Sequence, residues 1–315
     1  MNYERFFTQV KDPTGFEKFD FSHSYGFIGS CFSDHIFHKF KHFGLTAWQS
    51  PFGTTYNPLS IEFQLDSLLN LDKKYTYFQA ESEVFSWETA HLLTDVSEVN
   101  LEKTLMDLRK ATRAELLKTN VLFITLGTAS AYELVSNGQL VANCHKQPDS
   151  LFKKTMLPIE DMNRAFAALV FKLKEVCPNL TIVLTVSPVR HLRGGLIENS
   201  RSKARLLELC HRLVEQTDAM YLPVYEWVID ELRDYRFFEA DGVHPNAQAV
   251  DFVYEKMMGL FFEKKTQDAF KEIDAYRKMQ QHRPLSARNS EEFQRFEKKI
   301  ETKKAEIESK FGVFL

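Results

Sequence analysis

Apolar residues follow two alternating patterns along this chain. Short unbroken apolar runs predict strands that are buried on both faces, and these runs occupy residues 25–29, 121–126, 181–186 and 220–224. Apolar positions that recur every three or four residues predict amphipathic helices at residues 33–43, 58–70, 99–118, 160–177, 198–217 and 226–235 and after Pro245. Strands that alternate with helices predict an α/β fold, here a three-layer sandwich with a parallel sheet of about five strands.

Three segments interrupt this alternation. Residues 45–58 are rich in turn-forming residues, and we read them as a connecting loop. Residues 75–88 predict a β-hairpin inserted between core units, and we expect His91, just beyond it, on the surface or in the core rather than in a pocket. Residues 130–158 predict a long connection, of the kind that serves a binding site or an interface.

The composition becomes strongly charged after residue 262. We therefore divide the chain into an α/β domain, residues 1–262, and a helical extension, residues 263–315. A break at residues 283–286 and a cap at Asn289 or Ser290 predict a helical hairpin in this extension. The apolar stripe of its second helix consists of Phe293, Phe296, Ile300, Ile307 and Phe311. We expect the stripe to pack on the chain's own domain, and the alternative is a homo-oligomer joined through these helices.

Composition and charge narrow the classes of function. The 28 phenylalanines and a hydrophobic share of 44% provide for a sizeable core. A net charge of −3 gives no basic surface for a phosphate backbone, so we expect no nucleic-acid partner. We see neither an apolar stretch of membrane-spanning length nor a secretory signal, and we expect a cytoplasmic protein with no membrane partner. The cysteines (Cys31, Cys144, Cys177 and Cys210) lack metal-ligand spacing, and we expect neither a metal nor a cofactor.

The stretch from Tyr25 to Asp34 has the pattern of a strand, a sharp turn and the start of a helix. Gly29 permits a tight turn, and Ser30 and Cys31 follow it directly. The free amides of a first helical turn lower the pKa of a thiol or stabilise a developing oxyanion. Ser30 and Cys31 are therefore the candidate nucleophiles, and the simpler interpretation is a plain turn with a small buried residue.

Asp241 and His244 stand three residues apart, just before the closing helix, in which Pro245 suits the first position. A carboxylate and an imidazole on one turn can form the orienting pair of a catalytic triad, because the carboxylate fixes the imidazole tautomer. The alternative is that both residues serve to cap the helix.

Several motifs together resemble one family. Residues 29–32 read Gly-Ser-Cys-Phe, and the chain resembles the GSCFA family, which is related to the SGNH (GDSL-like) hydrolases. Residues 51–54, 126–129, 143–146 and 185–191 are also similar to the family, and the resemblance spans roughly residues 25–260. It implies the SGNH fold, a flavodoxin-like three-layer sandwich, and hydrolase chemistry at the turn that carries Ser30 and Cys31.

The resemblance also implies groups that would bind an oxyanion or the substrate. In the SGNH pattern a glycine after the second strand donates its amide to the oxyanion, and Gly53 is the matching candidate. A Gly-x-Asn motif donates an asparagine amide, but here Gly127 and Thr128 are followed by Ala129. The Thr128 hydroxyl, a backbone amide, or Asn143 from the next loop could take the place of this asparagine.

Arg190, at the carboxyl end of a predicted strand, could clamp a carboxylate or sugar phosphate, although a surface arginine paired with an acid is an equal alternative. Laid on the Gly-Asp-Ser pattern, spacing favours Cys31 as the nucleophile and residue type favours Ser30. Of the two, we prefer Cys31. We expect a hydrolase or acyltransferase that acts on an acyl ester or thioester, for example an O-acetyl group on a saccharide or small metabolite. The alternative is a non-catalytic ligand-binding module on the same scaffold.

Overall fold

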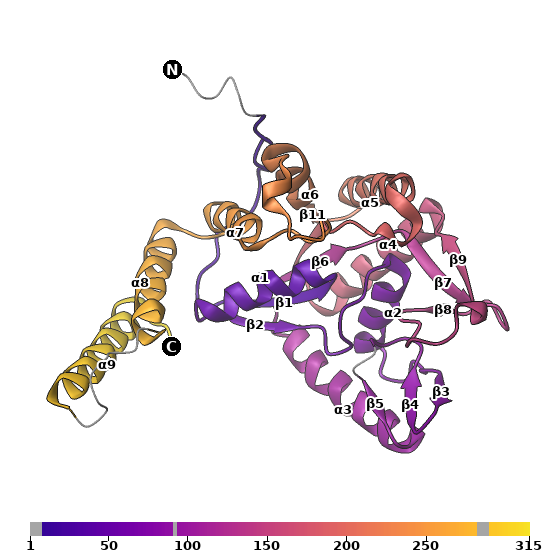
Figure 1. Ribbon diagram of the computed structural model, residues 1–315, viewed down its shortest axis with the longest axis horizontal. Coiled ribbons are helices and arrows are strands. Elements are labelled where there is room, and N and C mark those ends of the chain that lie inside the picture. Colours follow the sequence, from indigo (N-terminus) through magenta and orange to yellow (C-terminus); the bar gives the residue numbers. More distant parts are fainter. Residues whose placement is uncertain (1–7, 91–92, 282–289) are drawn as a thin grey trace.

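Five parallel strands form the central sheet of the computed structural model, which describes residues 8–90, 93–281 and 290–315. The strands are β1 (Ser24–Gly29), β2 (Thr46–Gln49), β6 (Val121–Leu126), β10 (Thr181–Val186) and β11 (Met220–Tyr221). Their order across the sheet is β11-β10-β6-β1-β2. The chain's first strand is thus an inner strand, with β6 on one side and β2 on the other (Figure 1).

The inner strands end in register. Gly29 of β1 pairs with Thr125 of β6, and Thr125 pairs with Thr185 of β10. All residues of β1 and β6 are buried, as expected for strands that are covered on both faces. Because the carboxyl ends of parallel strands meet at one edge, the residues that follow β1, β6 and β10 share that edge of the sheet.

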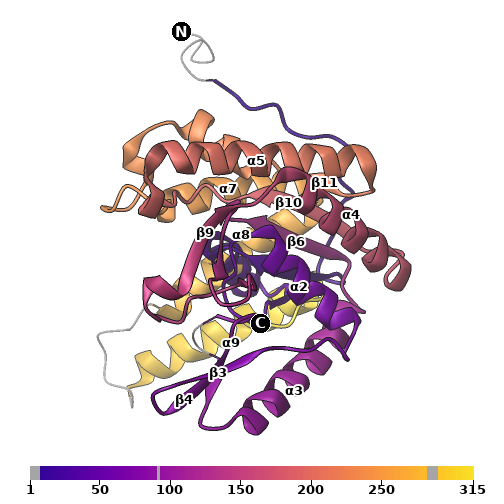
Figure 2. The same ribbon diagram turned by 90° about the vertical axis from the view of Figure 1, so that its right-hand side faces the viewer.

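Helices cover both faces of the sheet (Figures 1 and 2). One layer consists of α1 (Cys31–His42), α6 (Val224–Glu226) with a π-helix (Trp227–Leu232), and α7 (Ala247–Phe261). The other layer consists of α2 (Pro58–Leu69), α3 (Glu98–Leu116), α4 (Ile159–Val176) and α5 (Gly195–Gln216). Short 3-10 turns occur at Asp149–Leu151, Leu192–Gly194 and Tyr235–Phe237.

The side chains of β6 alternate between these two layers. Val121 and Phe123 belong to the apolar cluster beneath α1 and α7. Leu122 and Ile124 belong to the cluster beneath α2, α3, α4 and α5. The predicted three-layer α/β sandwich with a five-stranded parallel sheet is confirmed.

Two small antiparallel sheets lie outside the central one. The first contains the predicted hairpin, β3 (Tyr77–Ala80) and β4 (Glu83–Ser86), and adds β5 (Thr94–Asp95). The second consists of β7 (Ser130–Leu134), β8 (Leu140–Val141) and β9 (Phe152–Met156). His91 lies outside the described residues.

The second small sheet corrects the prediction of a long loop over residues 130–158. β9 contains Lys153 and Lys154, and its half-exposed residues lack the apolar alternation that would have marked a strand. β9 is held by pairing with β7, from Ser130 opposite Met156 to Leu134 opposite Phe152. The turn-rich residues 45–58 contain β2, a short edge strand of partly exposed residues.

Three element boundaries also differ from the sequence prediction. α7 is capped by Asn246, whose side chain accepts a hydrogen bond from the amide of Ala249, so Pro245 precedes the cap rather than opening the helix. The helix predicted over residues 226–235 is instead α6 followed by the π-helix, which ends at Arg233 in a left-handed conformation. The last strand covers only Met220–Tyr221.

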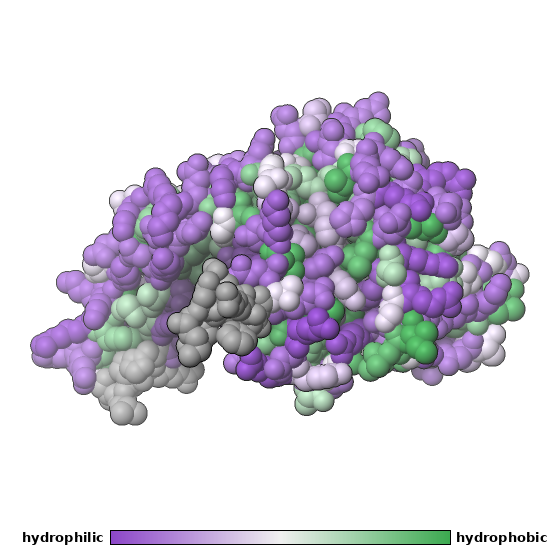
Figure 3. Space-filling view, turned by 90° about the horizontal axis from the view of Figure 1, so that it is seen from above, coloured by the Kyte–Doolittle hydropathy of each residue, from purple (hydrophilic) through white to green (hydrophobic). Residues whose placement is uncertain are grey.

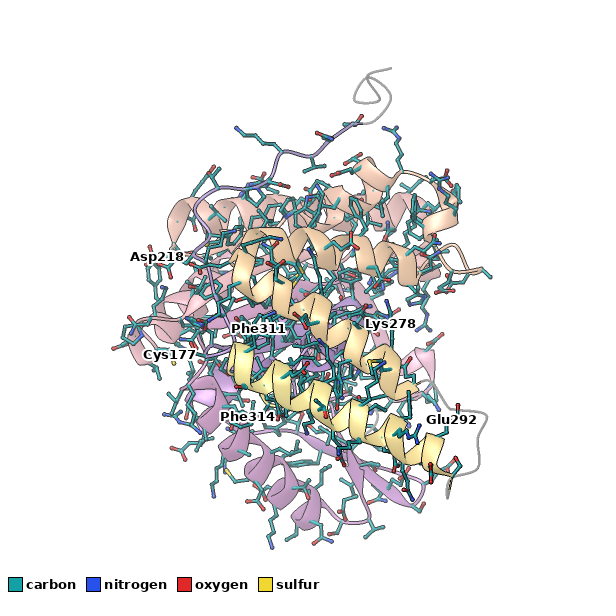
Figure 4. All side chains as sticks on the ribbon, turned by 90° about the vertical axis from the view of Figure 1, so that its left-hand side faces the viewer. Cys177, Asp218, Lys278, Glu292, Phe311 and Phe314 are labelled. Atoms are coloured by element: carbon teal, nitrogen blue, oxygen red, sulfur yellow. The ribbon has the colours of Figure 1, made fainter. Side chains whose placement is uncertain are left out.

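The charged extension forms the predicted helical hairpin of α8 (Lys264–Gln281) and α9 (Glu291–Phe311). The two helices lie side by side, as Figure 4 shows, with Phe311 at the end of α9 and Phe314 just beyond it. Ser290 caps α9 through the amide of Phe293, whereas residues 283–286 and Asn289 lie outside the described residues.

The hairpin packs on the chain's own domain, as predicted. The Phe270 ring of α8 contacts Phe43 after α1 and Phe262 after α7, at centroid distances of 5.2 and 5.1 Å. Ile307 of α9 is buried in the same cluster. The exterior of the molecule seen from above is largely hydrophilic with scattered hydrophobic patches (Figure 3). The division into two units and a homo-oligomer through these helices stay predictions.

Within the described residues, no helix combines the length and the apolar content that crossing a bilayer requires.

The packing of α8 predicts the effect of truncating Phe270. Because its ring is 5% exposed and contacts Phe43 and Phe262, Phe270→Ala should lower the free energy of unfolding by about 3–5 kcal/mol. Phe314 is 90% exposed and serves as the control, and Phe314→Ala should change stability by no more than about 0.5 kcal/mol. Urea unfolding of both variants measures this difference, and equal stabilities would show that the hairpin does not dock as described.

Candidate active site

The turn between β1 and α1 is held against the end of β6. Gly29 has φ +127°, and a Cβ atom there would lie 2.1 Å from the carbonyl oxygen of Thr125. The amide of Ser30 donates to the same carbonyl oxygen at 3.0 Å. Ser30 is the N-cap of α1 in an extended conformation, and Cys31 is therefore the first helical residue. Only glycine allows this approach, which fixes where the two candidate nucleophiles lie.

Ser30 and Cys31 differ in their access to solvent. Ser30 is fully buried, and among the described residues its Oγ has no hydrogen-bond partner. Cys31 is half-buried and its thiol is free. The loop after β2 closes over the turn, because the amide of Thr55 donates to the carbonyl oxygen of Gly29 at 2.9 Å. Of the two residues, Cys31 is therefore the more accessible.

The pKa of the Cys31 thiol is raised above its ordinary value, first by burial and then by the nearby charge of Asp34. The amides of Cys31 and Phe32 and the charge of Lys203 lower it, as predicted for a helix N-terminus, but burial and Asp34 outweigh them. The resting thiol is therefore protonated at neutral pH. A base must take its proton before it can attack.

Asp241 and His244 form a hydrogen-bonded pair. Oδ2 of Asp241 accepts from Nδ1 of His244 at 2.7 Å, and Oδ1 accepts the amides of Val243 and His244 at 2.8 and 3.0 Å. These hydrogen bonds, the one from His244 foremost, lower the pKa of Asp241 to about 2. With its proton on Nδ1, the imidazole presents Nε2 as an acceptor. This is the arrangement of an orienting carboxylate and a base.

The pair lies at the same edge of the sheet as the β1–α1 turn. The charge of His244 acts on His35, one turn along α1 from Cys31, and on His191, which follows β10. Among the described residues, no hydrogen bond joins His244 to Ser30 or Cys31. The His244 side chain is 45% exposed, and catalytic hydrogen bonds are often long in unliganded enzymes.

A cavity of about 580 Å³ opens beside this edge. Tyr56 and His191 line it, with ring centroids 5.3 Å apart. Thr128 and Asn143 also line it, as do other polar residues: Asn57, Ser130, Tyr132, Lys146, Gln147, Asp149, Lys154, Arg193, Glu198, Asn199 and Ser202. The cavity thus joins some of the predicted binding residues but contains none of Ser30, Cys31, Asp241 and His244.

Gly53 lies in the loop after β2, as the resemblance implied. Its φ is +78°, and a Cβ atom there would meet the Cβ atom of Ala90 at 2.5 Å. The next residue, Thr54, donates its hydroxyl to Asp34 of α1 at 3.1 Å. The Gly53 amide takes part in no hydrogen bond within the described part of the chain.

In the segment after β6, few hydrogen-bond donors are free to take the place of the missing asparagine amide. The amides of Gly127 and Thr128 both donate to the carbonyl oxygen of Tyr56, at 2.8 and 3.0 Å. The Thr128 hydroxyl bonds the hydroxyl of Ser202 at 2.9 Å, and Ser202 also accepts the amide of Ala129. These backbone amides are therefore not free to bind an oxyanion, contrary to one of the predicted substitutes.

Two further predicted binding residues take different positions. Asn143 reaches the cavity, and its Oδ1 accepts the amide of His145 at 2.7 Å. Arg190 does not reach it, because its guanidinium lies over the ring of Phe238 at 4.7 Å and lines a separate hollow of about 280 Å³. The expectation that Arg190 binds the substrate is thus not supported, although its amide donates to the carbonyl oxygen of Val243 and so braces the histidine loop.

Sequence reasoning missed two residues at this edge. Lys203 of α5 is 1% exposed, and its Nζ donates to the carbonyl oxygens of Gly127 and Ser187 at 2.6 and 2.7 Å. His191 has a buried Nε2 without a hydrogen-bond partner in the described residues. A lone lysine in an amphipathic helix reads as a surface residue, and only its place among apolar neighbours (Leu206 and Leu209 on the same helix) signals burial.

The comparisons with known proteins identify one family. The chain matches the profile of the GSCFA family over residues 25–257. It belongs to the GSCFA family. No curated protein matches the sequence closely enough to count as a relative.

Solved structures with a similar fold include esterases and a lipase-like protein. An acetyl xylan esterase from Butyrivibrio proteoclasticus has 9% identity and a TM-score of 0.38, over 76% of this chain and 63% of that one. A Parabacteroides merdae protein described as a GDSL-like lipase has 17% identity and a TM-score of 0.37, over 78% and 97%. A psychrotrophic esterase from Pseudoalteromonas has 12% identity and a TM-score of 0.35, over 76% and 96%. At these identities the similarity concerns the fold.

Across the described ranges, no three His, Cys, Asp or Glu side chains lie close enough together to hold a metal ion. Cys144 lines the cavity, whereas the ring of the adjacent His145 is buried, with Nε2 at 2.8 Å from the carbonyl oxygen of Ser86.

The burial of His191 predicts a pH-dependent stability. Burial foremost, and then the charges of Lys203 and His244, lower the pKa of His191 from 6.5 to about 4. Below pH 6.5 the unfolded chain therefore binds a proton at His191 more readily than the folded chain does. The contribution of His191 to the free energy of unfolding is fully present above the unfolded pKa and is lost as the pH falls toward 4. Between about pH 7 and about pH 4.5, wild type should lose roughly 2–3 kcal/mol more than His191→Gln.

Urea unfolding at the two pH values measures this difference. His211→Gln, which changes an exposed histidine of α5, is the matched control and should behave as wild type. Equal losses in wild type and His191→Gln would contradict the buried, neutral imidazole.

Proposed function

We propose that this chain is an SGNH-like hydrolase or acyltransferase that acts on an acyl ester or thioester, with Cys31 as nucleophile. The observation that carries the proposal is the 2.7 Å hydrogen bond between Asp241 and His244. This pair lies at the sheet edge where the half-buried Cys31 is the first residue of α1. A carboxylate that fixes the tautomer of an exposed imidazole has a clear use in proton transfer. Ser30 is the weaker candidate because its hydroxyl is fully buried.

The proposed reaction follows the triad scheme. Nε2 of His244 takes the proton of the Cys31 thiol, and Sγ forms a bond to the acyl carbon while the carbonyl oxygen becomes an oxyanion. The oxyanion is held by the Gly53 amide and the first amides of α1. When it collapses, the leaving alcohol or thiol takes the proton from Nε2. Water or an acceptor hydroxyl then attacks the thioester by the same route and releases the free thiol.

Asp241 supports two of these steps. Because its pKa lies at about 2, its carboxylate stays ionised throughout the neutral range. The negative charge stabilises the imidazolium that forms when His244 accepts the thiol proton. His244 must move toward Cys31 or reach it through a water, and its 45% exposed side chain leaves room for that movement.

The cavity favours a polar, uncharged substrate such as an O-acetylated saccharide. Four of its charged lining residues are paired with one another, Arg193 with Asp149 at 2.5 Å and Lys154 with Glu198, and Lys146 is the further cation of the lining. The paired charges largely neutralise one another, and the amide and hydroxyl groups of Asn143, Asn199 and Tyr132 can bond sugar hydroxyls. Tyr56 and His191 would form the wall between the sugar and the acyl group.

The rival proposal is a non-catalytic ligand-binding module. It is favoured by the raised pKa of Cys31, by the absence of a His244–Cys31 hydrogen bond in the described residues, and by Ala129 at the asparagine position. In that case the same cavity binds a ligand that is released unchanged.

We further propose a cytoplasmic location. All the cysteines, which lie in the described residues, are free thiols, as is usual in a reducing compartment.

Intact-mass labelling with p-nitrophenyl acetate tests the catalytic proposal. Wild type should gain a single acetyl group, Cys31→Ala should gain none, and His244→Ala should react at least about 100-fold more slowly because it lacks the base. Cys144→Ala removes the other half-exposed thiol and is the matched control, with labelling as in wild type.

Two results would redirect the proposal. Labelling lost only in Ser30→Ala would make the protein an ordinary serine hydrolase. If wild type stays unlabelled with several acyl donors, the ligand-binding module becomes the better account.

A further inference from the structure

Lys203 is a buried amine without a carboxylate partner. It is 1% exposed, and among the described residues no Asp or Glu forms an ion pair with it. Its two hydrogen bonds go to the carbonyl oxygens of Gly127 and Ser187. Lysine is almost never fully buried unless it is paired, because removing its charge from water is costly. A fold that keeps such a residue must gain something from its position.

The two carbonyl groups place the amine at the candidate active site. Gly127 follows β6 and Ser187 follows β10, and both strands end at the edge where β1 delivers Cys31. An ammonium group has three hydrogens, so two bonds to carbonyls leave one hydrogen uncommitted. The charge of Lys203 acts on Cys31, and the charge of Cys31 acts on Lys203.

Lys203 also braces the segment from which the usual oxyanion asparagine is missing. Its bond to Gly127 fixes the chain two residues before Ala129. The backbone amides there are taken by Tyr56 and Ser202. The positive charge of Lys203 behind this segment favours negative charge that develops nearby.

We propose that Lys203 is a positioning residue of this site: its amino group ties the ends of β6 and β10 together, and its positive charge stabilises the thiolate of Cys31. The purpose of this charge rests on the proposed function, whereas the experiment that tests its effect on Cys31 does not. The thiol proton passes to His244, the charge of Lys203 balances the thiolate that remains, and no covalent bond to the lysine forms.

The other charged groups around the pair act in known directions. Asp34 raises the pKa of Cys31, and the charge of Cys31 in turn raises that of Tyr56. Burial lowers the pKa of Lys203 to about 7, and the charge of Lys203 helps to keep His191 neutral. Because the amine and the thiol interact, protons leave the pair in shared steps, and the proposal assigns the reactivity of Cys31 to the ammonium–thiolate form of the pair.

The rate of Cys31 alkylation by iodoacetamide as a function of pH tests the inference. The measurement uses the Cys144→Ser background, since Cys177 and Cys210 are buried. At about pH 7.5, Lys203→Met should react at least about tenfold more slowly than the parent, with its midpoint moved to higher pH, because the thiolate has lost its cation. Arg201→Met, which removes an exposed cation from the same helix, is the control and should keep the parent profile.

A purely structural lysine gives a different result. If Lys203→Met folds, as judged by circular dichroism and thermal unfolding, and keeps the parent pH profile, the inference is wrong. If it does not fold, Lys203→Arg decides: a permanently charged guanidinium should leave Cys31 at least as reactive as in the parent, and a profile moved to higher pH overturns the inference.

Alkylation requires no acyl substrate, so the outcome is separate from that of the proposed function. If the alkylation of Cys31 depends on Lys203 but no acyl donor labels the protein, this inference holds and the proposed enzymatic function is wrong.

Discussion

The contact between Gly29 and the carbonyl oxygen of Thr125 is the constraint on which the site depends. A side chain at residue 29 would collide with that oxygen, and the Ser30 amide bonds the same atom. This closeness fixes the first turn of α1 at the end of β6, with one small side chain turned inward and the next turned outward. Ser30 is fully buried and Cys31 is half-buried, so backbone geometry makes Cys31 the more accessible of the two candidate nucleophiles.

The edge of the sheet carries several polar groups that burial disfavours. Ser30 Oγ and His191 Nε2 are buried without hydrogen-bond partners in the described chain, and Lys203 lacks a carboxylate. Each such group costs roughly 1–3 kcal/mol. A core of interlocking aromatic rings on the α1 and α7 face supplies stability to offset this, for instance Phe27 stacked on Phe123 at 5.0 Å. The aromatic residues that stabilise the fold and the polar residues of the candidate site thus lie at different parts of the same sheet.

The sequence was sufficient for the parts of the fold that are locally encoded. Buried strands such as residues 121–126 and amphipathic helices such as residues 160–177 can be recognised from the pattern of their apolar residues. The Gly-Ser-Cys-Phe motif led to the correct family. β2 and β9 could not be found this way, because pairing with β1 and β7 holds them rather than their own apolar pattern.

The site shows the same limit. The hydrogen bond between Asp241 and His244 lies within one turn, so spacing alone could suggest it. Lys203 could not be found, because its partners Gly127 and Ser187 are brought to it by the sheet and are backbone carbonyls without a sequence signature. The position of Arg190 could not be predicted for a similar reason, since its guanidinium lies over the ring of Phe238, which is distant in sequence.

The most direct test of the central claim is a crystal structure of the wild-type protein after reaction with an acyl chloromethyl ketone. The account predicts a covalent bond at Sγ of Cys31, the acyl group directed toward the cavity beside Tyr56, and Nε2 of His244 within hydrogen-bond reach, about 3 Å, of the reacted group. An unmodified Cys31 with His244 still turned to solvent, or an adduct on another residue, would contradict it.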